Sequence, residues 1–378
     1  MNLTNRPPSA DTNDRDDPPP RGAADPTYPT PGGFEQRLLA RARALQLRRG
    51  ACVVLGFSGG RDSLALAAAM RRVRAVLGIE SLLVHVDHRL RPTSARDAAE
   101  AADLAAALDV PFRALAVEAP VTVLHPHLGL EEAARRERYR LLALAARDAG
   151  AVAVAVAHHG EDQAETVLLH LLRGSGVHGA AAMGEWGPPP YFLTPAENDI
   201  SREHLSLPLW RPLLTESRQT VDAYVAALDL TWIEDPSNDD PTLRRNAVRH
   251  RILPVLEEHV PGSAAALGRY ARLAADDDAA LAQLAAVALR DQVDPGGRLR
   301  VAALRDYHPA VQRRMVRQWI AAGSGLTALT AERTDAVVAL ARSDRSGSTI
   351  EIGERWTVRR ERGMLHLIEP ERDPEERQ

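Results

Sequence analysis

The chain has 378 residues, and its 47 basic and 51 acidic residues leave a formal net charge of −4. At about 150 residues per domain, this length predicts two or three domains with room for a hydrophobic core. No apolar run approaches the ~20 residues that a membrane helix needs, and the N-terminus lacks the apolar stretch of a secretory signal. The single cysteine, Cys52, excludes an internal disulfide framework and any CxxC redox or zinc pair. We therefore expect a cytoplasmic protein with no membrane partner.

Every basic residue of the chain is an arginine, since the sequence contains no lysine. A Walker A loop needs a lysine after its last glycine, so P-loop NTPase chemistry is excluded. Catalysis through a Schiff base on a protein lysine is excluded for the same reason.

The first 33 residues are poor in large apolar side chains. They carry eight of the 26 prolines and five aspartates. Such a segment cannot bury enough surface to offset the entropy lost on ordering, so we predict a disordered tail over residues 1–33. A helical stripe of Phe34, Leu38 and Leu45 predicts that order begins near Phe34.

Strand and helix signals then alternate. Short apolar runs bounded by turn residues predict strands over 52–57, 81–86, 112–117 and 152–157, and longer amphipathic runs predict helices over 63–77, 92–108, 131–148 and 161–173. This order is typical of right-handed βαβ units. We therefore predict an α/β domain over residues 34–215, with a parallel sheet and helices on both faces.

The rest of the chain has a different character. Residues 184–208 are rich in proline and glycine and indicate a loop or insertion. Helical patterns follow over 221–228, 244–258, 264–290 and 309–321, and residues 348–368 show short alternating strands. We expect a helical domain over residues 216–345 and a small β element over residues 346–370.

The clearest chemical motif is a doubled glycine directly after the first predicted strand, in the segment Ser58–Gly59–Gly60–Arg61–Asp62–Ser63. Glycines let the backbone approach a phosphate closely, and the N-terminus of the following helix offers free N–H groups. The two serine hydroxyls can donate to an anion, and Asp62 could hold a Mg²⁺ that bridges phosphates. The alternative is an ordinary glycine turn with a serine cap.

Seven further segments accompany this loop in the same order along the chain. They are HVDHRLRP (85–92), EAAR to RY (132–139), HHGEDQAET (158–166), RGSG (173–176), RPLL (211–214), DPSN (235–238) and RNAVR (245–249). SGGxDS resembles the pyrophosphate loop of N-type ATP pyrophosphatases. The whole set, over roughly residues 50–255, resembles the tRNA(Ile)-lysidine synthetase family.

This resemblance implies an adenine nucleotide α-hydrolase-like fold and a ligase that forms a C–N bond. The implied reaction adenylates the wobble cytidine of an isoleucine tRNA with a CAU anticodon, splitting ATP into AMP and pyrophosphate with Mg²⁺. Free L-lysine then displaces AMP to give lysidine. Residues 34–215 would be the ATP-binding catalytic domain, and residues 216–345 would bind tRNA and substrate.

The fourth predicted helix carries a second constellation of polar residues. His158, Asp162 and Glu165 are spaced to share one face of this helix or its leading turn, and two carboxylates with an imidazole suit a cationic amine. Spacing alone also allows a solvated helix face or a zinc site. In the family that the chain resembles, the matching residues bind the substrate lysine, and Asp162 is our candidate for accepting the proton of its amine.

The resemblance assigns the remaining site residues. The implied ATP-binding residues are Ser58, Gly59, Gly60, Arg61, Asp62, Ser63 and His88, with Asp62 holding Mg²⁺. The implied catalytic residues are Asp62, Asp162 and Arg211.

Arginines gather in two short segments, at positions 135, 136, 138 and 140 and at positions 244, 245, 249 and 251. Guanidinium groups suit bidentate contact with phosphate, so these segments are candidate tRNA or ATP contacts. A charged helix face paired with neighbouring glutamates is the alternative. We assign tRNA binding to Arg138, Arg173, Arg245, Asn246 and Arg249. Residues 174–179 match GxGxxG by chance, because they follow a helix, and we interpret them as a loop that places Arg173 near the active site.

Two other functions remain open at this stage. The first is a tRNA-thiolating enzyme with the same adenylation loop, although a lone Cys52 cannot provide a catalytic cysteine pair. The second is a catalytically inactive paralogue that binds tRNA. The chain also departs from the family pattern, with Arg89 where glycine is usual and Glu161 where aspartate is common. The oligomeric state is open between a monomer and a homodimer.

Overall fold

The computed structural model describes residues 32–90, 93–187, 207–234, 244–326, 329–343, 345–353 and 356–369. The predicted tail lies outside these residues except for its last two positions, and so do most of the 184–208 segment and the whole DPSN motif. The first helix, α1 (Gly33–Ala44), begins where the sequence places the start of order. No helix in the described ranges is long and apolar enough to cross a membrane.

The N-terminal part of the chain is built on a six-stranded sheet. Its four predicted strands are β1 (Cys52–Gly56), β2 (Glu80–Asp87), β3 (Phe112–Ala116) and β4 (Ala153–Ala155), and they pair in parallel. Two further strands were not predicted, β5 (Trp186–Gly187) and β6 (Leu209–Trp210). Each has two residues, too few to show alternation, and they extend the order to β3-β2-β1-β4-β6-β5 with only β5 antiparallel.

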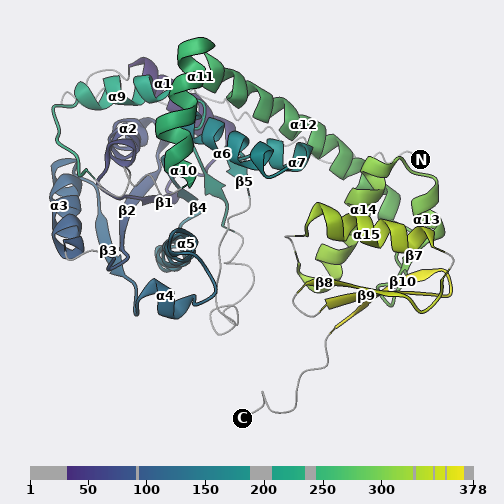
Figure 1. Ribbon diagram of the computed structural model, residues 1–378. Coiled ribbons are helices and arrows are strands. Elements are labelled where there is room, and N and C mark those ends of the chain that lie inside the picture. The colour runs from purple at the N-terminus through teal and green to yellow at the C-terminus, as the bar shows by residue number, and fades with distance from the viewer. Residues whose placement is uncertain are drawn as a thin grey trace, which may run out of the picture.

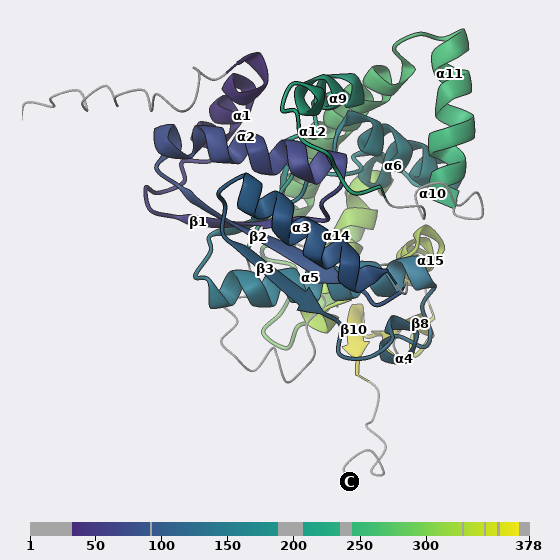
Figure 2. The same cartoon turned by 90° about the vertical axis from the view of Figure 1, so that its left-hand side faces the viewer.

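Helices cover both faces of this sheet, as predicted (Figures 1 and 2). Val53 and Leu55 of β1 point into the core formed with α1 and α2 (Arg61–Leu77), whereas Val54 packs on the other side with α5 (Leu130–Asp148). All three are fully buried. A continuous apolar run is therefore required in β1, because neighbouring side chains enter different cores.

The remaining helices of this part close the edges and one end of the sheet. Their bounds are α3 (Ser94–Ala107), α4 (Val121–Leu124), α6 (Gly160–Leu172), α7 (Val177–Ala180) and α9 (Arg218–Ala226). Helix α3 packs on β2 and β3, and α9 packs on α2. Helix α6 follows β4 but packs mainly against later helices.

The helix predicted over 244–258 is continuous but irregular. It comprises α10 (Arg244–Ala247), a π-helical turn η3 (Val248–Ile252) and α11 (Leu253–His259). Pro254 has no N–H to donate back along the helix, and its ring needs space in the preceding turn. The wider π-helical turn directly before it supplies that space.

The long helix α12 (Ser263–Leu289) connects the two parts of the molecule (Figure 1). Its 27 residues span about 40 Å, and it packs against α6 and α7 and then against α14. The C-terminal unit comprises β7 (Leu299–Arg300), α13 (Ala302–Arg305), α14 (Pro309–Ser324), α15 (Ala331–Arg342), β8 (Thr349–Gly353), β9 (Trp356–Glu361) and β10 (Met364–Ile368). Its antiparallel sheet and helices share one core that includes Trp319, Val337 and Leu365.

A buried carboxylate ties α1 to the start of α6 and to the segment before α9. Glu216 accepts hydrogen bonds from Arg37 at 2.7 Å and from Arg41 at 2.9 Å, and its backbone carbonyl accepts the N–H of Gly160 at 2.8 Å. Burial alone would raise the pKa of Glu216, but the two guanidinium groups outweigh it and lower that pKa below its usual range. The ionised form is therefore the one that stabilises the fold.

Changing Glu216→Gln should lower the free energy of unfolding by about 1–3 kcal/mol, because two charge-assisted hydrogen bonds are lost. The wild-type contribution is present above the ordinary glutamate pKa of about 4.3 and is lost as pH falls through the lower native pKa, so the variant should also show a shallower acid dependence. Urea unfolding at several pH values measures both effects. Glu131→Gln, at an exposed site on α5, is the control, and a Glu216 variant as stable as that control would contradict the prediction.

Candidate active site

A cavity of about 870 Å³ opens at the carboxyl ends of β1, β2 and β4. This is the edge at which α/β sheets bind ligands. The cavity is lined by the loop after β1, the end of β2, one side of α5, the start of α6 and the segment 232–234. The motifs that the sequence analysis singled out after strands one and four therefore meet in one place.

The SGGRDS loop turns at Gly59, whose φ of +78° lies in the left-handed region. A Cβ atom at this position would meet Cδ1 of Ile233 at 2.3 Å, and the Gly59 carbonyl accepts the Ile233 N–H at 2.9 Å. The hydroxyl of Ser63 donates to the Gly60 carbonyl at 2.9 Å and lies 3.2 Å from the Ser58 hydroxyl. Glycine is thus required at position 59 by both conformation and contact.

Three helices begin at this cavity. Gly60 precedes α2, His159 precedes α6 and Ser217 precedes α9. Residues from the first turn of each helix, Asp62, Asp162 and Arg218, line the cavity. The first N–H groups of α6 and α9 already donate to other groups of the protein, whereas the start of α2 has no side-chain cap. All three ends carry a partial positive charge, and the start of α2 also offers N–H groups to a ligand, which favours a polyanion such as a triphosphate.

Asp62 faces the cavity with one carboxylate oxygen uncommitted. Its Oδ1 is buried without a hydrogen-bond partner, and its Oδ2 lies 3.8 Å from Nε2 of His159. Burial raises the pKa of Asp62. The described residues contain no group of three or more side chains that could hold a metal ion, so they offer no zinc cage. A single orphaned carboxylate does fit Mg²⁺, which is held by one or two carboxylates together with substrate phosphates.

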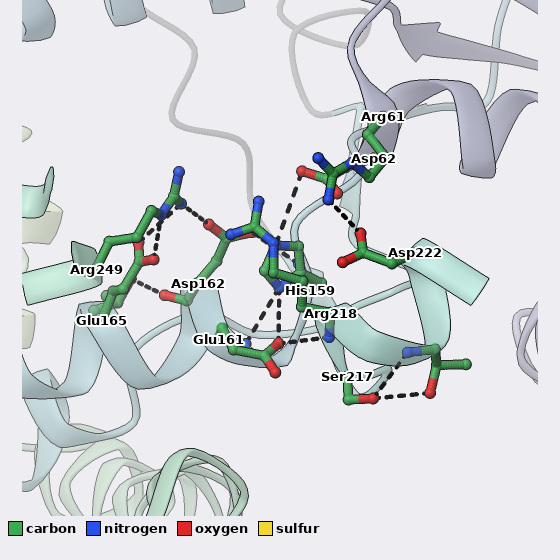
Figure 3. A network of polar contacts seen from close by, with 12 residues as sticks. Arg61, Asp62, His159, Glu161, Asp162, Glu165, Ser217, Arg218, Asp222 and Arg249 are labelled. Atoms are coloured by element: carbon green, nitrogen blue, oxygen red, sulfur yellow. Dashed lines mark hydrogen bonds and ion pairs between the residues drawn. The ribbon is translucent and has the colours of Figure 1, made fainter. Parts of the chain in front are cut away.

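His159 links the loop to α6 and α9 (Figure 3). Its Nδ1 lies 3.0 Å from Glu161 Oε2, its Nε2 lies 3.5 Å from Asp162 Oδ2, and its backbone N–H donates to Asp162 Oδ2 at 2.9 Å. Glu161 also accepts the backbone N–H of Arg218 at 2.8 Å. Burial lowers the pKa of His159, but the surrounding carboxylates outweigh it and the net shift is upward. The sequence motif contained His159, but only the structure reveals this linking position.

Asp162 and Glu165 are buried, with 6% and 1% of their surface exposed, so they do not form a solvated helix face. Both pair with arginines from α10 and η3, and Figure 3 shows the pairing with Arg249. Arg249 contacts Glu165 at 2.6 Å and Asp162 at 2.7 Å, and Arg245 contacts them at 2.8 and 3.2 Å. We call these four residues the carboxylate–arginine cluster. It joins two carboxylates assigned to lysine with two arginines assigned to tRNA.

Charge pairing sets the protonation states in this cluster. Burial would raise the pKa of Asp162, but His159 and the two arginines hold it well below its usual range. His158 lies in the turn before α6 and lines the cavity, and burial together with nearby arginines lowers its pKa well below the ordinary value. Burial and the nearby Arg138 lower the pKa of His88, at the end of β2, to about 4. Both histidines are therefore neutral at pH 7 and do not repel a cationic ligand.

The other predicted site residues occupy varied positions. Arg138 lines the cavity, and its guanidinium lies 5.6 Å from the centre of the Tyr139 ring. Arg211, predicted to be catalytic, is not among the residues that line the cavity; it is buried and donates to the Gly184 carbonyl at 2.8 Å. Asn246 is 7% exposed, so its side chain is turned into the protein.

The expectation that Arg173 lies near the active site is wrong. Helix α6 begins at the cavity with Gly160, and Arg173 caps its other end. Thirteen residues of helix place the two ends about 18 Å apart. In the other arginine segment, Arg136 and Arg140 pair with Glu132 and Glu137, which supports the charged-helix alternative for those two residues.

Sequence reasoning missed several residues that line the cavity. Arg218 and the segment Trp232–Ile233–Glu234 contribute to it from beyond the predicted catalytic domain. Arg61 donates to Asp222 at 2.7 Å and lies 4.9 Å from the centre of the Trp232 ring. Nothing in the local pattern near 218–234 marks these positions, because their partners lie between 57 and more than 150 residues away in sequence.

Arg89 has a φ of +52°, in the left-handed region that glycine adopts at no steric cost. This explains why glycine is usual at this position in the family that the chain resembles. The arginine retains the same turn at an energetic cost of about 1–2 kcal/mol.

Changing Gly59→Ala should weaken nucleotide binding at least about tenfold, equivalent to about 1.4 kcal/mol, because the added Cβ strains the turn and displaces Ile233. Titration calorimetry with ATP and Mg²⁺ measures this loss. Gly50→Ala is the matched control, since Gly50 has a φ of +79° and nothing within 4 Å of an added Cβ. A Gly59 variant that binds ATP as tightly as the Gly50 variant would disprove the role of the loop.

Comparisons with known proteins agree with this geometry. The PP-loop domain family matches residues 34–256, and the TilS substrate binding domain matches residues 299–366. The tRNA(Ile)-lysidine synthase of Salinispora arenicola is 39% identical over 321 residues, which cover 84% of this chain and 91% of the relative. The enzyme of Geobacter sulfurreducens is 34% identical over 83% of this chain and 64% of its own length.

The tRNA(Ile)-lysidine synthase of Deinococcus deserti is 41% identical over 65% of this chain and 42% of its own length. The chain thus spans less than two thirds of the Deinococcus and Geobacter relatives. Among solved structures, the U34-tRNA thiolase NcsA of Methanococcus maripaludis has a TM-score of 0.48 at 17% identity, and the match covers 64% of this chain and 78% of that one. This similarity is too low to indicate a function.

The PP-loop domain family matches more than half of this chain, and the chain covers nine tenths of the Salinispora relative. This chain therefore belongs to the tRNA(Ile)-lysidine synthase family.

Proposed function

We propose that this chain is a ligase that converts the wobble cytidine of a CAU-anticodon isoleucine tRNA to lysidine, using free L-lysine and splitting ATP into AMP and pyrophosphate. The observation that carries the proposal is that the SGGRDS loop and Asp162, one of the two buried carboxylates of α6, line one cavity. Its volume of about 870 Å³ lies in the usual range for small-molecule sites. An activated base and an amine can therefore meet there.

The first half-reaction uses the phosphate side of the cavity. The 2-carbonyl oxygen of the cytidine attacks the α-phosphorus of ATP, the bond to the β-phosphate breaks, and pyrophosphate leaves. Backbone N–H groups of the loop and the start of α2 are oriented to stabilise the departing negative charge. Mg²⁺ bound by Asp62 would neutralise part of the phosphate charge.

The second half-reaction uses the carboxylate side. The ε-amine of lysine attacks the activated carbon, a C–N bond forms, the C–O bond to the adenylate breaks, and AMP leaves. The negative charges of Asp162 and Glu165 attract the ammonium group, and neutral His158 does not oppose it. Because its pKa is low while Arg245 and Arg249 are paired with it, Asp162 accepts a proton well only after an arginine moves away.

Two observations weigh against the alternatives. Cys52 begins β1, at the opposite end of the strand from the cavity, and burial raises the pKa of its thiol, so it is poorly placed for sulfur transfer. Asp62, Asp162 and Glu165 are all retained in the site, as an active enzyme requires and an inactive tRNA-binding paralogue does not. We further propose that the protein acts in the cytoplasm, where ATP and tRNA are available.

Radioactive lysine supplied with ATP, Mg²⁺ and a CAU-anticodon isoleucine tRNA should be incorporated into that RNA, with one AMP released per lysine. The initiator methionine tRNA, which shares the anticodon, is the control and should remain unlabelled. Scintillation counting of the purified RNA measures transfer. Label in neither RNA overturns the proposed function, and label in both overturns the proposed tRNA specificity.

Changing Asp162→Asn should reduce lysine transfer by about 10²- to 10⁴-fold, because a charge that holds the amine and can accept its proton is removed. Asp278→Asn is the matched control, since Asp278 also pairs with an arginine, Arg314, but lies on α12. Transfer rates are compared at saturating ATP, and circular dichroism checks that both variants are folded. Wild-type transfer by a folded Asp162 variant would exclude this role.

A further inference from the structure

Five arginines line the cavity, and only some of them pair with a carboxylate of the protein. They are Arg61, Arg89, Arg138, Arg218 and Arg249. Arg61 pairs with Asp222 at 2.7 Å, and Arg249 pairs with Glu165 at 2.6 Å. In the part of the chain that the structure describes, the other three have no carboxylate within ion-pair distance. A bound anion is the natural partner for such a group.

The three unmatched arginines lie on different sides of the cavity. Arg89 follows His88 in the chain, and Arg138 is close enough to His88 to lower the pKa of that histidine. Arg218 instead begins α9 and lines the cavity together with residues of the SGGRDS loop. Figure 3 shows Arg218 beside His159, which in turn lies 3.8 Å from Asp62.

The backbone of Arg218 is held in place independently of its guanidinium group. Its N–H donates to Glu161 at 2.8 Å, and Ser217 caps the helix by accepting the Thr220 N–H at 3.1 Å. The side chain is half-buried at the first position of α9. The fold therefore positions a partly desolvated cation beside the SGGRDS loop, with no carboxylate of the described residues within ion-pair distance.

We propose that Arg218 binds the pyrophosphate portion of ATP, the β- and γ-phosphates, and holds it against the SGGRDS loop. This inference rests on the proposed use of ATP by that loop. It adds to the loop a residue from α9, beyond the α/β domain that the sequence predicts. A planar guanidinium can donate two parallel hydrogen bonds to phosphate oxygens, which a backbone N–H group cannot do.

Binding of Mg²⁺-ATP, AMP and Mg²⁺-pyrophosphate is measured by titration calorimetry without tRNA or lysine. Arg218→Met keeps the backbone N–H that donates to Glu161 and removes only the charged head. It should weaken ATP and pyrophosphate binding by about 10- to 100-fold, as expected for lost charge-assisted hydrogen bonds, while AMP affinity changes by less than about twofold. Arg218→Lys should restore part of the affinity, since it keeps the charge but not the fork.

Gln219→Ala is the matched control, because Gln219 is exposed in the same helical turn and does not line the cavity. Unchanged ATP affinity in Arg218→Met overturns the inference. An equal loss of ATP and AMP affinity also overturns it, because that result indicates damage to the whole site. This outcome is separable from the proposed function. A wild-type protein that transfers no lysine refutes the proposed reaction. A loss of ATP affinity without a loss of AMP affinity in the Arg218 variant still supports the phosphate contact.

Discussion

Two buried negative charges on one helix are the constraint on which much of this structure depends. Asp162 and Glu165 occupy adjacent turns of α6 with almost no exposure to solvent. An unpaired charge in such a position costs several kcal/mol, so Arg245 of α10 and Arg249 of η3 must approach and pair with them. Their pairing docks α10 and the π-helical turn onto the α/β domain. Any cation that approaches Asp162 from the cavity must compete with these arginines for that carboxylate.

The other side of the cavity, near the SGGRDS loop, carries positively charged groups. The start of α2 and Arg218, which has no carboxylate of the described residues within ion-pair distance, lie at the SGGRDS loop together with Asp62. Anions are stabilised there by N–H groups already fixed in direction, so little reorganisation is needed when charge develops on a leaving group. Under the proposed function, this part of the cavity would bind phosphate and the part near Asp162 would bind the ammonium group. His159 lies between them and contacts carboxylates of both.

Much of the fold could be predicted because it is encoded locally. The first four strands and the helices between them follow from apolar runs and glycine turns, and the loop after β1 is a compact motif. Strands β5 and β6 could not be predicted, because two-residue strands carry no periodicity and form only by pairing with β4 and each other. The wrong placement of Arg173 has a similar origin, since the motif order does not specify which end of α6 faces the cavity.

The sequence by itself determined which chemical groups are present: a glycine turn suited to phosphate, carboxylates at helical spacing, arginine as the basic residue throughout, and a single cysteine. Which of these groups are charged, paired or free was decided only by the tertiary structure. Arg245 lies 80 positions from Glu165 in the chain, and Arg218 lies 156 positions from Asp62, so no local pattern reports their proximity. Ion pairing and desolvation depend on distance in space, and that distance exists only once the sheet and α6 have brought the segments together.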